Sequence, residues 1–275
     1  LNLVKNLVGF GVLGLSAGLG AGTGLLLALF LSVLLGVVSG YTFSMLGRVC
    51  NVTSRKTFKD LGLATSGPSF ANSMAMVCTL KTFLTCVAYS IVIADSFSAI
   101  LRGFGVEGFL SGRNTVLFIM MAFLVTPMCL LKDLSLLAYT SLAGISGMLY
   151  TTVFMLVRCF DGSYEPGGVY YASMQPDFRP DFGEGIYMLN VNIKTLVLLC
   201  ALSTAFDAHY NAPKFYFGLQ DTSARRFDRV VFSSFFIALI LFISIMLAGY
   251  FTFGLNTCGN VLNNYSHYDP MATIA

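Results

Sequence analysis

Charged residues are scarce in this chain, and their scarcity excludes an ordinary soluble domain. Asp, Glu, Lys and Arg make up 11% of the 275 residues, against about 25% in soluble proteins. Hydrophobic residues make up 56%, and the mean hydropathy is +0.77. The net charge of +3 is spread over several loops without a dense basic run. The composition predicts an all-α, multi-pass membrane protein that has the lipid bilayer as a partner and binds no nucleic acid.

Metal-binding and catalytic residue patterns are also missing. The chain has only two histidines, His209 and His267, and none of its seven cysteines forms a CxxC pair. Neither a histidine-metal site nor a Ser-His arrangement is therefore visible. We expect no enzyme activity, no metal and no resident cofactor.

Long apolar runs, in contrast, are abundant. A membrane helix needs about 20 mostly apolar residues to cross a hydrocarbon core of roughly 30 Å. About seven segments approach this pattern: 1–20, 24–46, 72–101, 115–131, 134–157, an interrupted segment around 195–216, and 230–254. Pro127 predicts a kink near the end of its segment. The polar stretches 47–69 and 158–190 are expected to be exposed loops.

The interrupted segment contains the sequence STAFDAHYNAPKFY at 203–216. The uncharged run 195–206 spans only about 18 Å as a helix, which is too short for a crossing. Completing the crossing carries polar residues and a proline into the bilayer: Asp207, His209, Asn211 and Pro213. This predicts a broken helix whose irregular backbone lines a cavity. The alternative is a helix that ends at Phe206 and leaves a cytoplasmic turn behind it.

A second interruption is predicted in the first apolar segment, around 9–11. Glycines punctuate this segment at Gly9, Gly11, Gly14, Gly18 and Gly20. Close packing of helices through small residues is the alternative explanation. Two interrupted helices in corresponding halves are a sequence sign of a secondary transporter's substrate site.

An unwound helix offers free backbone N–H and C=O groups, which suit the carboxylate and the ammonium of an amino acid. Gly9 and Gly11 are expected to adopt unusual backbone angles and to let a ligand approach closely. Tyr89 is either a substrate contact or a packing residue. The candidate substrate-binding residues are Gly9, Phe10, Gly11, Val12, Tyr89, Phe206, Asp207, His209 and Asn211.

Three residues are candidates for ion coupling. Lys5 could donate to the unwound segment, replace a bound cation, or extend its ammonium to the membrane interface. His209 either carries a coupling proton or serves as a hydrogen-bonding residue. Asp207 qualifies only where it is buried. Two further charges, Lys81 and Asp95, lie about 21 Å apart along one helix and are not expected to pair.

The distribution of basic residues predicts the orientation. With the first segment entering from the cytoplasm, nine lysines and arginines lie in inner loops and five in outer loops. This bias favours that orientation. It places the sequon Asn264-Tyr265-Ser266 on the outer or lumenal side, which makes Asn264 a glycosylation candidate.

Several motifs resemble the amino acid/auxin permease family. The stretch NLVKNLVGFGVLGLS at 2–16 is similar to the family's first-helix signature. Further agreement lies in KDLSLLAYTS at 132–141, AFDAHYNAPKFYFGL at 205–219, GYFTFG at 249–254 and NYS at 264–266. The resemblance covers nearly the whole chain and about seven helices of the family's larger set. It implies a single transmembrane transporter domain over 1–275 that is a fragment lacking the C-terminal helices.

The resemblance implies a leucine-transporter-type inverted-repeat fold, with helices 1 and 6 broken. It also implies secondary active, proton-coupled transport of amino acids in a vacuolar, lysosomal or plasma membrane, with Na⁺ left open as the coupling ion. Two positions depart from the pattern. Ser16 stands where the family usually has proline, and Lys5 replaces the asparagine of sodium-coupled members, as in vacuolar-type neutral amino acid transporters.

A seven-helix membrane receptor is the alternative from another functional class. A receptor would have continuous helices around its ligand pocket. The two predicted interruptions count against it.

Overall fold

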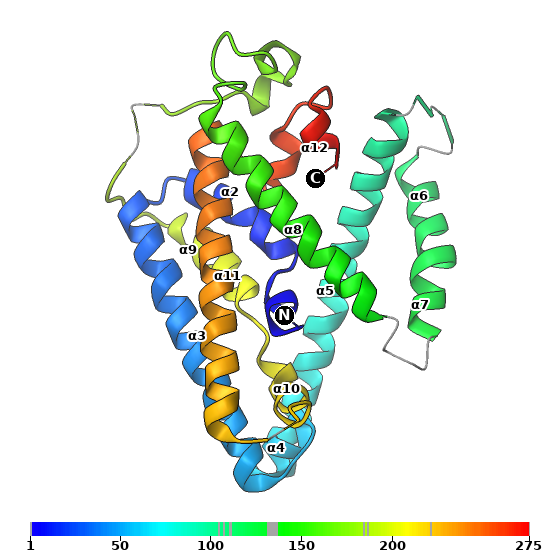
Figure 1. The fold of residues 1–275 in the computed structure, drawn as a ribbon, viewed down its shortest axis with the longest axis vertical. Coiled ribbons are helices and arrows are strands. Elements are labelled where there is room, and N and C mark those ends of the chain that lie inside the picture. Colours follow the sequence, from blue (N-terminus) through cyan, green and yellow to red (C-terminus); the bar gives the residue numbers. More distant parts are fainter. Residues whose placement is uncertain are drawn as a thin grey trace.

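The computed structural model describes residues 2–103, 105–106, 108–109, 112–130, 137–183, 185, 187–220 and 222–274. This part of the chain is helical (Figure 1), and its only extended pairing is an isolated bridge between Asp181 and Gly254. Four of its helices are long and apolar enough to cross a membrane: α3 (Leu25–Thr53), α5 (Pro68–Gly103), α8 (Leu137–Phe160) and α11 (Ala224–Phe253). The predicted helical membrane architecture is confirmed.

Both predicted interruptions are present. The first segment is divided into α1 (Asn2–Leu7), the 3₁₀ helix η1 (Phe10–Gly14) and α2 (Leu15–Gly20). The second is divided into α9 (Thr195–Ala205), the 3₁₀ helix η6 (His209–Asn211) and α10 (Ala212–Phe217). The pieces of the first segment lie in the interior of the bundle, where α2 and η1 pack against α9 and α11 (Figure 1).

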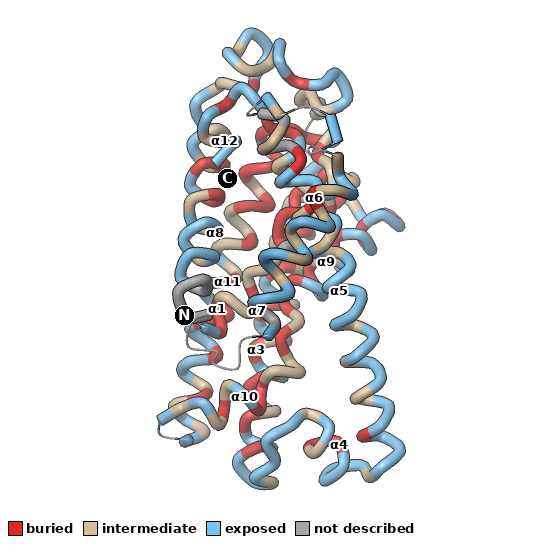
Figure 2. Tube along the Cα trace, turned by 90° about the vertical axis from the view of Figure 1, so that its right-hand side faces the viewer, coloured by how far each residue is buried: buried red, intermediate tan, exposed pale blue. Residues whose placement is uncertain are grey.

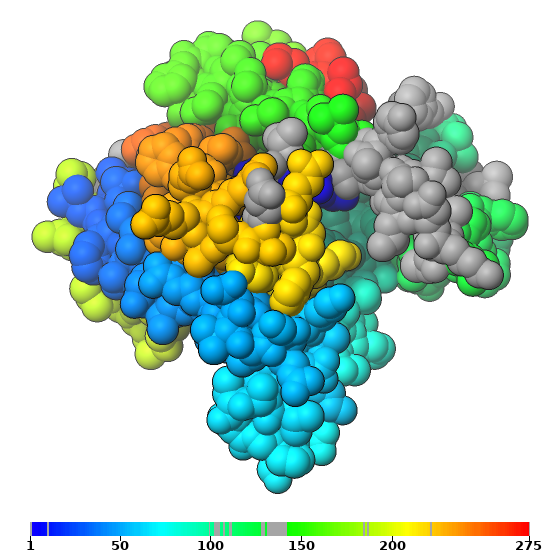
Figure 3. Space-filling model, turned by 60° about the horizontal axis from the view of Figure 1, so that its bottom comes forward, coloured from blue at the N-terminus to red at the C-terminus, as the bar shows by residue number. Residues whose placement is uncertain are grey.

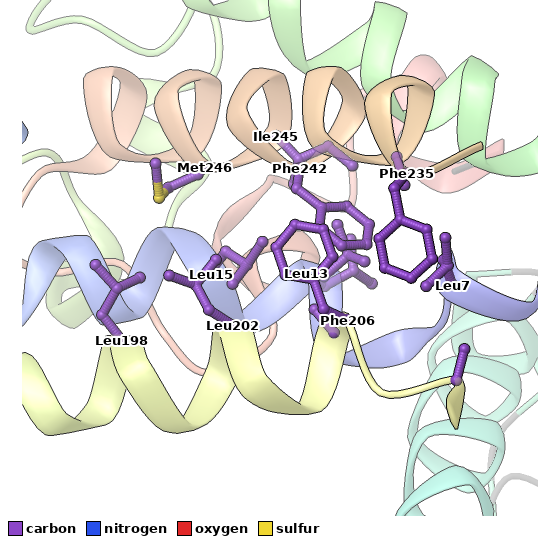
Figure 4. Close-up of a cluster of buried hydrophobic side chains, with 14 of the residues drawn as sticks. Leu7, Leu13, Leu15, Leu198, Leu202, Phe206, Phe235, Phe242, Ile245 and Met246 are labelled. Carbon is purple, nitrogen blue, oxygen red and sulfur yellow. The ribbon is translucent and has the colours of Figure 1, made fainter. Parts of the chain in front are cut away.

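Apolar packing holds these short pieces in place. Figure 4 shows Leu15 of α2, Leu202 and Phe206 of the α9 region, and Phe242 of α11 converging on one buried cluster. Helices this short are not stable in isolation, so tertiary contacts determine them. Gly18 serves this packing, because a Cβ added there would lie 2.9 Å from the Leu198 Cα. For Gly18, the close-packing explanation is therefore correct.

The expected loop 47–69 is largely helical, which corrects the prediction. Helix α3 continues to Thr53, and α4 (Phe58–Ser66) follows, with the Thr57 hydroxyl accepting a hydrogen bond from the Asp60 N–H (3.1 Å). Polar residues extend α3 because they find partners: the Tyr216 hydroxyl donates to Asn51 (2.8 Å). Figure 3 shows this end of the molecule, where the region around α4 projects from the rest.

The segment predicted at 115–131 also differs from a regular helix. It comprises α6 (Arg113–Met120), a π-helical turn (Met121–Val125) and α7 (Thr126–Leu130). The π turn ends two residues before Pro127, as expected where a proline disturbs the hydrogen-bond ladder. The predicted end at 131, the predicted start at 134 and the first half of the KDLSLLAYTS motif lie outside the described residues.

The polar stretch 158–190 is only partly exposed. It contains the 3₁₀ helices η4 (Tyr171–Ser173) and η5 (Pro176–Phe178) and lies at the same end as η7 (Val261–Asn264) and α12 (Pro270–Ile274) (Figure 1). Tyr164 is 1% exposed because its ring packs on aromatic neighbours from α11 and the loop after it. Figure 2 shows the contrast between the buried centre of the bundle and α5, which is exposed along most of its length.

Candidate functional site at the interrupted helices

The first interruption is built around Gly9. Its backbone is extended (φ −119°, ψ −175°), a conformation open to any residue, so the expected unusual angles are not found. Glycine lets Tyr89 come close instead, because a Cβ there would lie 2.8 Å from the Tyr89 hydroxyl of α5 and would displace that side chain. Gly11 faces α9, where a Cβ would meet the Thr204 side chain at an ordinary 3.6 Å. Tyr89 thus approaches the unwound backbone directly.

The second interruption begins where α9 ends at Ala205. The Asp207 N–H reaches back only to the Thr204 carbonyl (3.3 Å), and the chain then leaves the helical path. Pro213 lies in the first turn of α10, where a missing N–H costs nothing. The irregular backbone between α9 and α10 places Asp207 and His209 on the second interruption.

Helix α1 and the second interruption meet through side-chain amides. The Asn211 side-chain Nδ2 donates to the Asn6 Oδ1 at 3.0 Å. Among the described residues, the buried Asn6 Nδ2 has no hydrogen-bond partner. An unused buried donor thus lies where the two broken helices contact each other.

An ion pair crosses from α5 to the second interruption. The Lys81 ammonium lies 2.9 Å from the Asp207 Oδ2 and 4.4 Å from the centre of the Tyr210 ring. Asp95 pairs instead with Arg113 at 2.7 Å, which confirms that Lys81 and Asp95 do not pair with each other. Asp207 is therefore the carboxylate that the fold brings to the interruptions.

His209 extends the polar site toward α3. Its Nε2 lies 2.8 Å from the Thr42 hydroxyl oxygen, and the Thr42 hydroxyl donates to the Val38 carbonyl at 2.9 Å. On the other side of the ring, the His209 Nδ1 faces the Asp207 carboxylate, with 4.0 Å between Nδ1 and the Asp207 Oδ1. We call Asn6, Lys81, Asp207, His209 and Asn211 the interruption site.

Other predicted residues take different positions. The Phe206 ring is 1% exposed and packs against Phe235 and Phe242, so its side chain belongs to the core. Val12 is fully buried in the same way. Lys5 lies in the last turn of α1 and is half-buried. The side chain of Phe10 lies outside the described residues.

Ser16, at the position where the resemblance leads us to expect proline, lies within α2 and not at the interruption. It is completely buried, and its hydroxyl donates to the Ile245 carbonyl of α11 at 2.9 Å. Ser16 thus links α2 to α11, and the break in the first segment lies earlier, at Val8 and Gly9.

Sequence reasoning missed the roles of Lys81, Asn6, Thr42 and Tyr210. A signal existed for Lys81, because a charge inside an otherwise apolar helix implies a partner. On the same helix, the carboxylate of Asp95 is too distant to be the partner of Lys81, and the sequence does not show which other helix supplies one. Asn6, Thr42 and Tyr210 are ordinary polar residues whose roles depend on which helices pack together.

The glycosylation candidate Asn264 is inaccessible in this structure, which corrects that expectation. It is 1% exposed, its Nδ2 donates to the Asn256 carbonyl (2.9 Å), and its Oδ1 accepts from the Cys258 N–H (2.9 Å). The Nδ2 and the Oδ1 of Asn264 thus both stabilise the turn around η7. A glycan on Nδ2 has no room while these contacts exist.

A second charged cluster lies beside this turn, remote from the interruption site. Asp269 is fully buried and accepts from the Arg158 Nε (2.8 Å) and Nη2 (2.7 Å). The Tyr164 hydroxyl and the Met271 N–H each donate to it at 3.0 Å. Arg158 also donates to Asp161 at 2.6 Å. We call Arg158, Asp161, Tyr164 and Asp269 the Asp269 cluster.

Long apolar helices around a polar site inside the bundle define a multi-pass integral membrane protein. The comparison with family models matches residues 1–275 to the family described as "Transmembrane amino acid transporter protein", and the chain belongs to this family. The predicted resemblance is thereby confirmed. The members it resembles are transporters and not enzymes, which favours transport over the receptor alternative.

Three curated relatives illustrate the similarity. "Amino acid transporter AVT6E" of Arabidopsis thaliana is 26% identical over 65% of this chain and 36% of its own length. "Vacuolar amino acid transporter 6" of Saccharomyces cerevisiae is 28% identical over 72% of this chain and 42% of its own. "Putative sodium-coupled neutral amino acid transporter 11" of Danio rerio is 22% identical over 99% and 58%. The chain thus spans only part of these relatives' length. No solved structure matches it.

Proposed function

We propose that this protein carries out secondary active transport of amino acids, with the substrate bound between the two interruptions. The observation that supports this most is the contact between α1 and the second interruption, made by Asn6 and Asn211. Two broken helices that meet inside a membrane bundle offer backbone N–H and C=O groups to a small zwitterion. The names of the curated relatives point to the same substrate class.

We further propose a leucine-transporter-type inverted-repeat arrangement with about seven crossings in this chain. The four long helices would each cross once, and the two interrupted segments and the α6–α7 segment would supply the others. The positions of the interruptions support this, since they fall in the first and sixth of these crossings.

Protons are the coupling ion that the interruption site favours. The Lys81 ammonium lies 2.9 Å from the Asp207 carboxylate, so the charge of that carboxylate is already balanced without a coupling Na⁺. The His209 Nδ1 faces the other Asp207 oxygen, so a proton bound there would gain a carboxylate partner. We infer that His209 carries the proton and that Asp207 stabilises the protonated ring.

Uptake of labelled amino acids by the full-length protein in proteoliposomes tests this function. We expect uptake above that of protein-free liposomes, driven by a pH gradient and unaffected by removal of Na⁺. The variant His209→Gln, which can still bond Thr42, is expected to lose stimulation by the pH gradient while retaining exchange without a gradient. Absence of uptake for every amino acid would refute transport, and strict Na⁺ dependence would refute proton coupling alone.

A further inference from the structure

The Lys81–Asp207 pair differs from a structural salt bridge in how few contacts hold it. Lys81 is in the apolar span Pro68–Ser98, and Asp207 follows α9, so both charges lie within apolar segments. Charges at such positions are costly unless they are paired. In the described residues, a single close contact joins the two charged groups, between the Lys81 ammonium and one oxygen of Asp207. Besides it, the Lys81 ammonium contacts the face of the Tyr210 ring, and the other Asp207 oxygen lies 4.0 Å from His209.

Much of the bonding capacity of both groups is therefore unused. An ammonium has three N–H donors, and a carboxylate has about four acceptor positions. The side chains of Lys81 and Asp207 keep 31% and 35% of their surface exposed, whereas those of Arg158 and Asp269 keep 13% and 0%. The Lys81–Asp207 pair is thus partly exposed, and the Arg158–Asp269 pair is largely buried.

An amino acid zwitterion matches this pair in both charges. Its ammonium can replace the Lys81 ammonium on Asp207, and its carboxylate can take the place of Asp207 beside Lys81. No net charge enters or leaves the site, and no new charge is left unpaired. The Tyr210 ring, 4.4 Å from the Lys81 ammonium, offers that ammonium a second partner when it moves away from Asp207.

We propose that Lys81 and Asp207 recognise the two charges of the transported amino acid. The zwitterion separates the ion pair by binding between the two side chains. This inference rests on the proposed transport function and adds the residues that recognise the two charged ends. The site selects molecules carrying both an ammonium and a carboxylate. An amine lacking the carboxylate, or an acid lacking the ammonium, would leave one member of the pair without a partner.

Competition experiments with two analogues of one transported amino acid test this proposal in the full-length protein. One analogue is the amine without the carboxylate, and the other is the acid without the ammonium. Because a hydrogen bond to a charged group contributes roughly 10- to 100-fold in affinity, we expect wild-type protein to prefer the amino acid over each analogue by about that factor. Lys81→Met should lose the preference over the amine, and Asp207→Asn the preference over the acid.

The matched control is the other ion pair of α5. Neutralising both Asp95 and Arg113, whose side chains are 46% and 53% exposed, should leave both preferences unchanged. Ligand-induced thermal stabilisation of the purified variants provides a second measurement that does not depend on transport rate. Lys81→Arg, which keeps the charge, should retain the preference over the amine.

Three outcomes would overturn the proposal. Both preferences could persist in the single variants, or the double variant Lys81→Met/Asp207→Asn could regain wild-type affinity, as expected for a purely structural pair. Absence of amino acid binding and uptake in wild-type protein would refute the proposed function as well. Uptake by wild type with unchanged selectivity in the variants would refute this inference alone.

Discussion

The interruption site and the Asp269 cluster are both built around a carboxylate and a basic side chain, but they are organised in opposite ways. Asp269 accepts four hydrogen bonds and has no exposed surface. Asp207 has one close cationic partner, and about a third of its side chain is exposed. A fully satisfied buried network fixes a structure. A pair with unused donors and acceptors can exchange partners, which is what ligand binding requires.

The largest expected effect concerns the first interruption. Gly11→Leu should abolish uptake, at least about 100-fold, because a long side chain would enter the contact with Thr204 and displace η1 from α9. The protein should still reach the membrane. Labelled uptake together with quantification of membrane protein measures both.

Gly11→Ala is the control for this prediction. A Cβ at position 11 meets only an ordinary 3.6 Å contact, so alanine should retain most of the uptake. Normal uptake by Gly11→Leu would show that the first interruption is not part of the transport site.

The next effect concerns stability and the Asp269 cluster. Asp269→Asn leaves the Arg158 guanidinium, whose side chain is only 13% exposed, without its main counter-charge, which should cost about 3–5 kcal/mol of unfolding free energy. A large fall in the thermal unfolding midpoint of purified protein would reveal it. Asp161→Asn, at the more exposed partner of Arg158, should cost about 1 kcal/mol or less. Equal effects of the two variants would show that burial of the carboxylate does not determine how much each ion pair of Arg158 stabilises the protein.

A smaller effect is expected for Tyr164→Phe. The lost hydroxyl donates to Asp269 and accepts from the Ser266 N–H (3.2 Å), so the substitution should cost about 1–2 kcal/mol. Thermal unfolding at neutral pH measures the difference from wild type.

The same residue predicts a dependence on alkaline pH. Burial, and with it the charge of Asp269, raises the pKa of the Tyr164 hydroxyl above its ordinary value of 10.0. The stability that this hydroxyl contributes is present below pH about 10 and is lost as the pH rises through the higher pKa of the folded state. The difference in unfolding free energy between wild type and Tyr164→Phe should therefore shrink above pH about 10. A stability difference that persists or grows above that pH would contradict the role given to the Tyr164 hydroxyl.

The smallest effect belongs to the Asp95–Arg113 pair. Both side chains are about half exposed, so replacing either charge should change stability by less than about 0.5 kcal/mol. A larger change, measured by thermal unfolding of the single and double variants, would show that exposure is a poor guide to the strength of these ion pairs.

Sequence patterns were sufficient for the two interruptions, because they depend on local chemistry. The short uncharged run before Asp207 and the proline at 213 predicted the second break, and the glycines from Gly9 onward predicted the first. Local patterns failed at 47–53, which is helical because Asn51 and its neighbours find partners on α10 and α11. They also failed at Asn264, where the side-chain amide of the sequon makes internal hydrogen bonds.

The sequence by itself determined that this is a membrane protein with two broken helices, since hydropathy, glycine and proline act within a few residues of where they occur. Only the tertiary structure decided which charges pair. Lys81 and Asp207 are far apart in the chain, and an ion pair forms only when separate helices bring its members within a few ångströms. That packing depends on the fit of many side chains at once, which no local pattern contains.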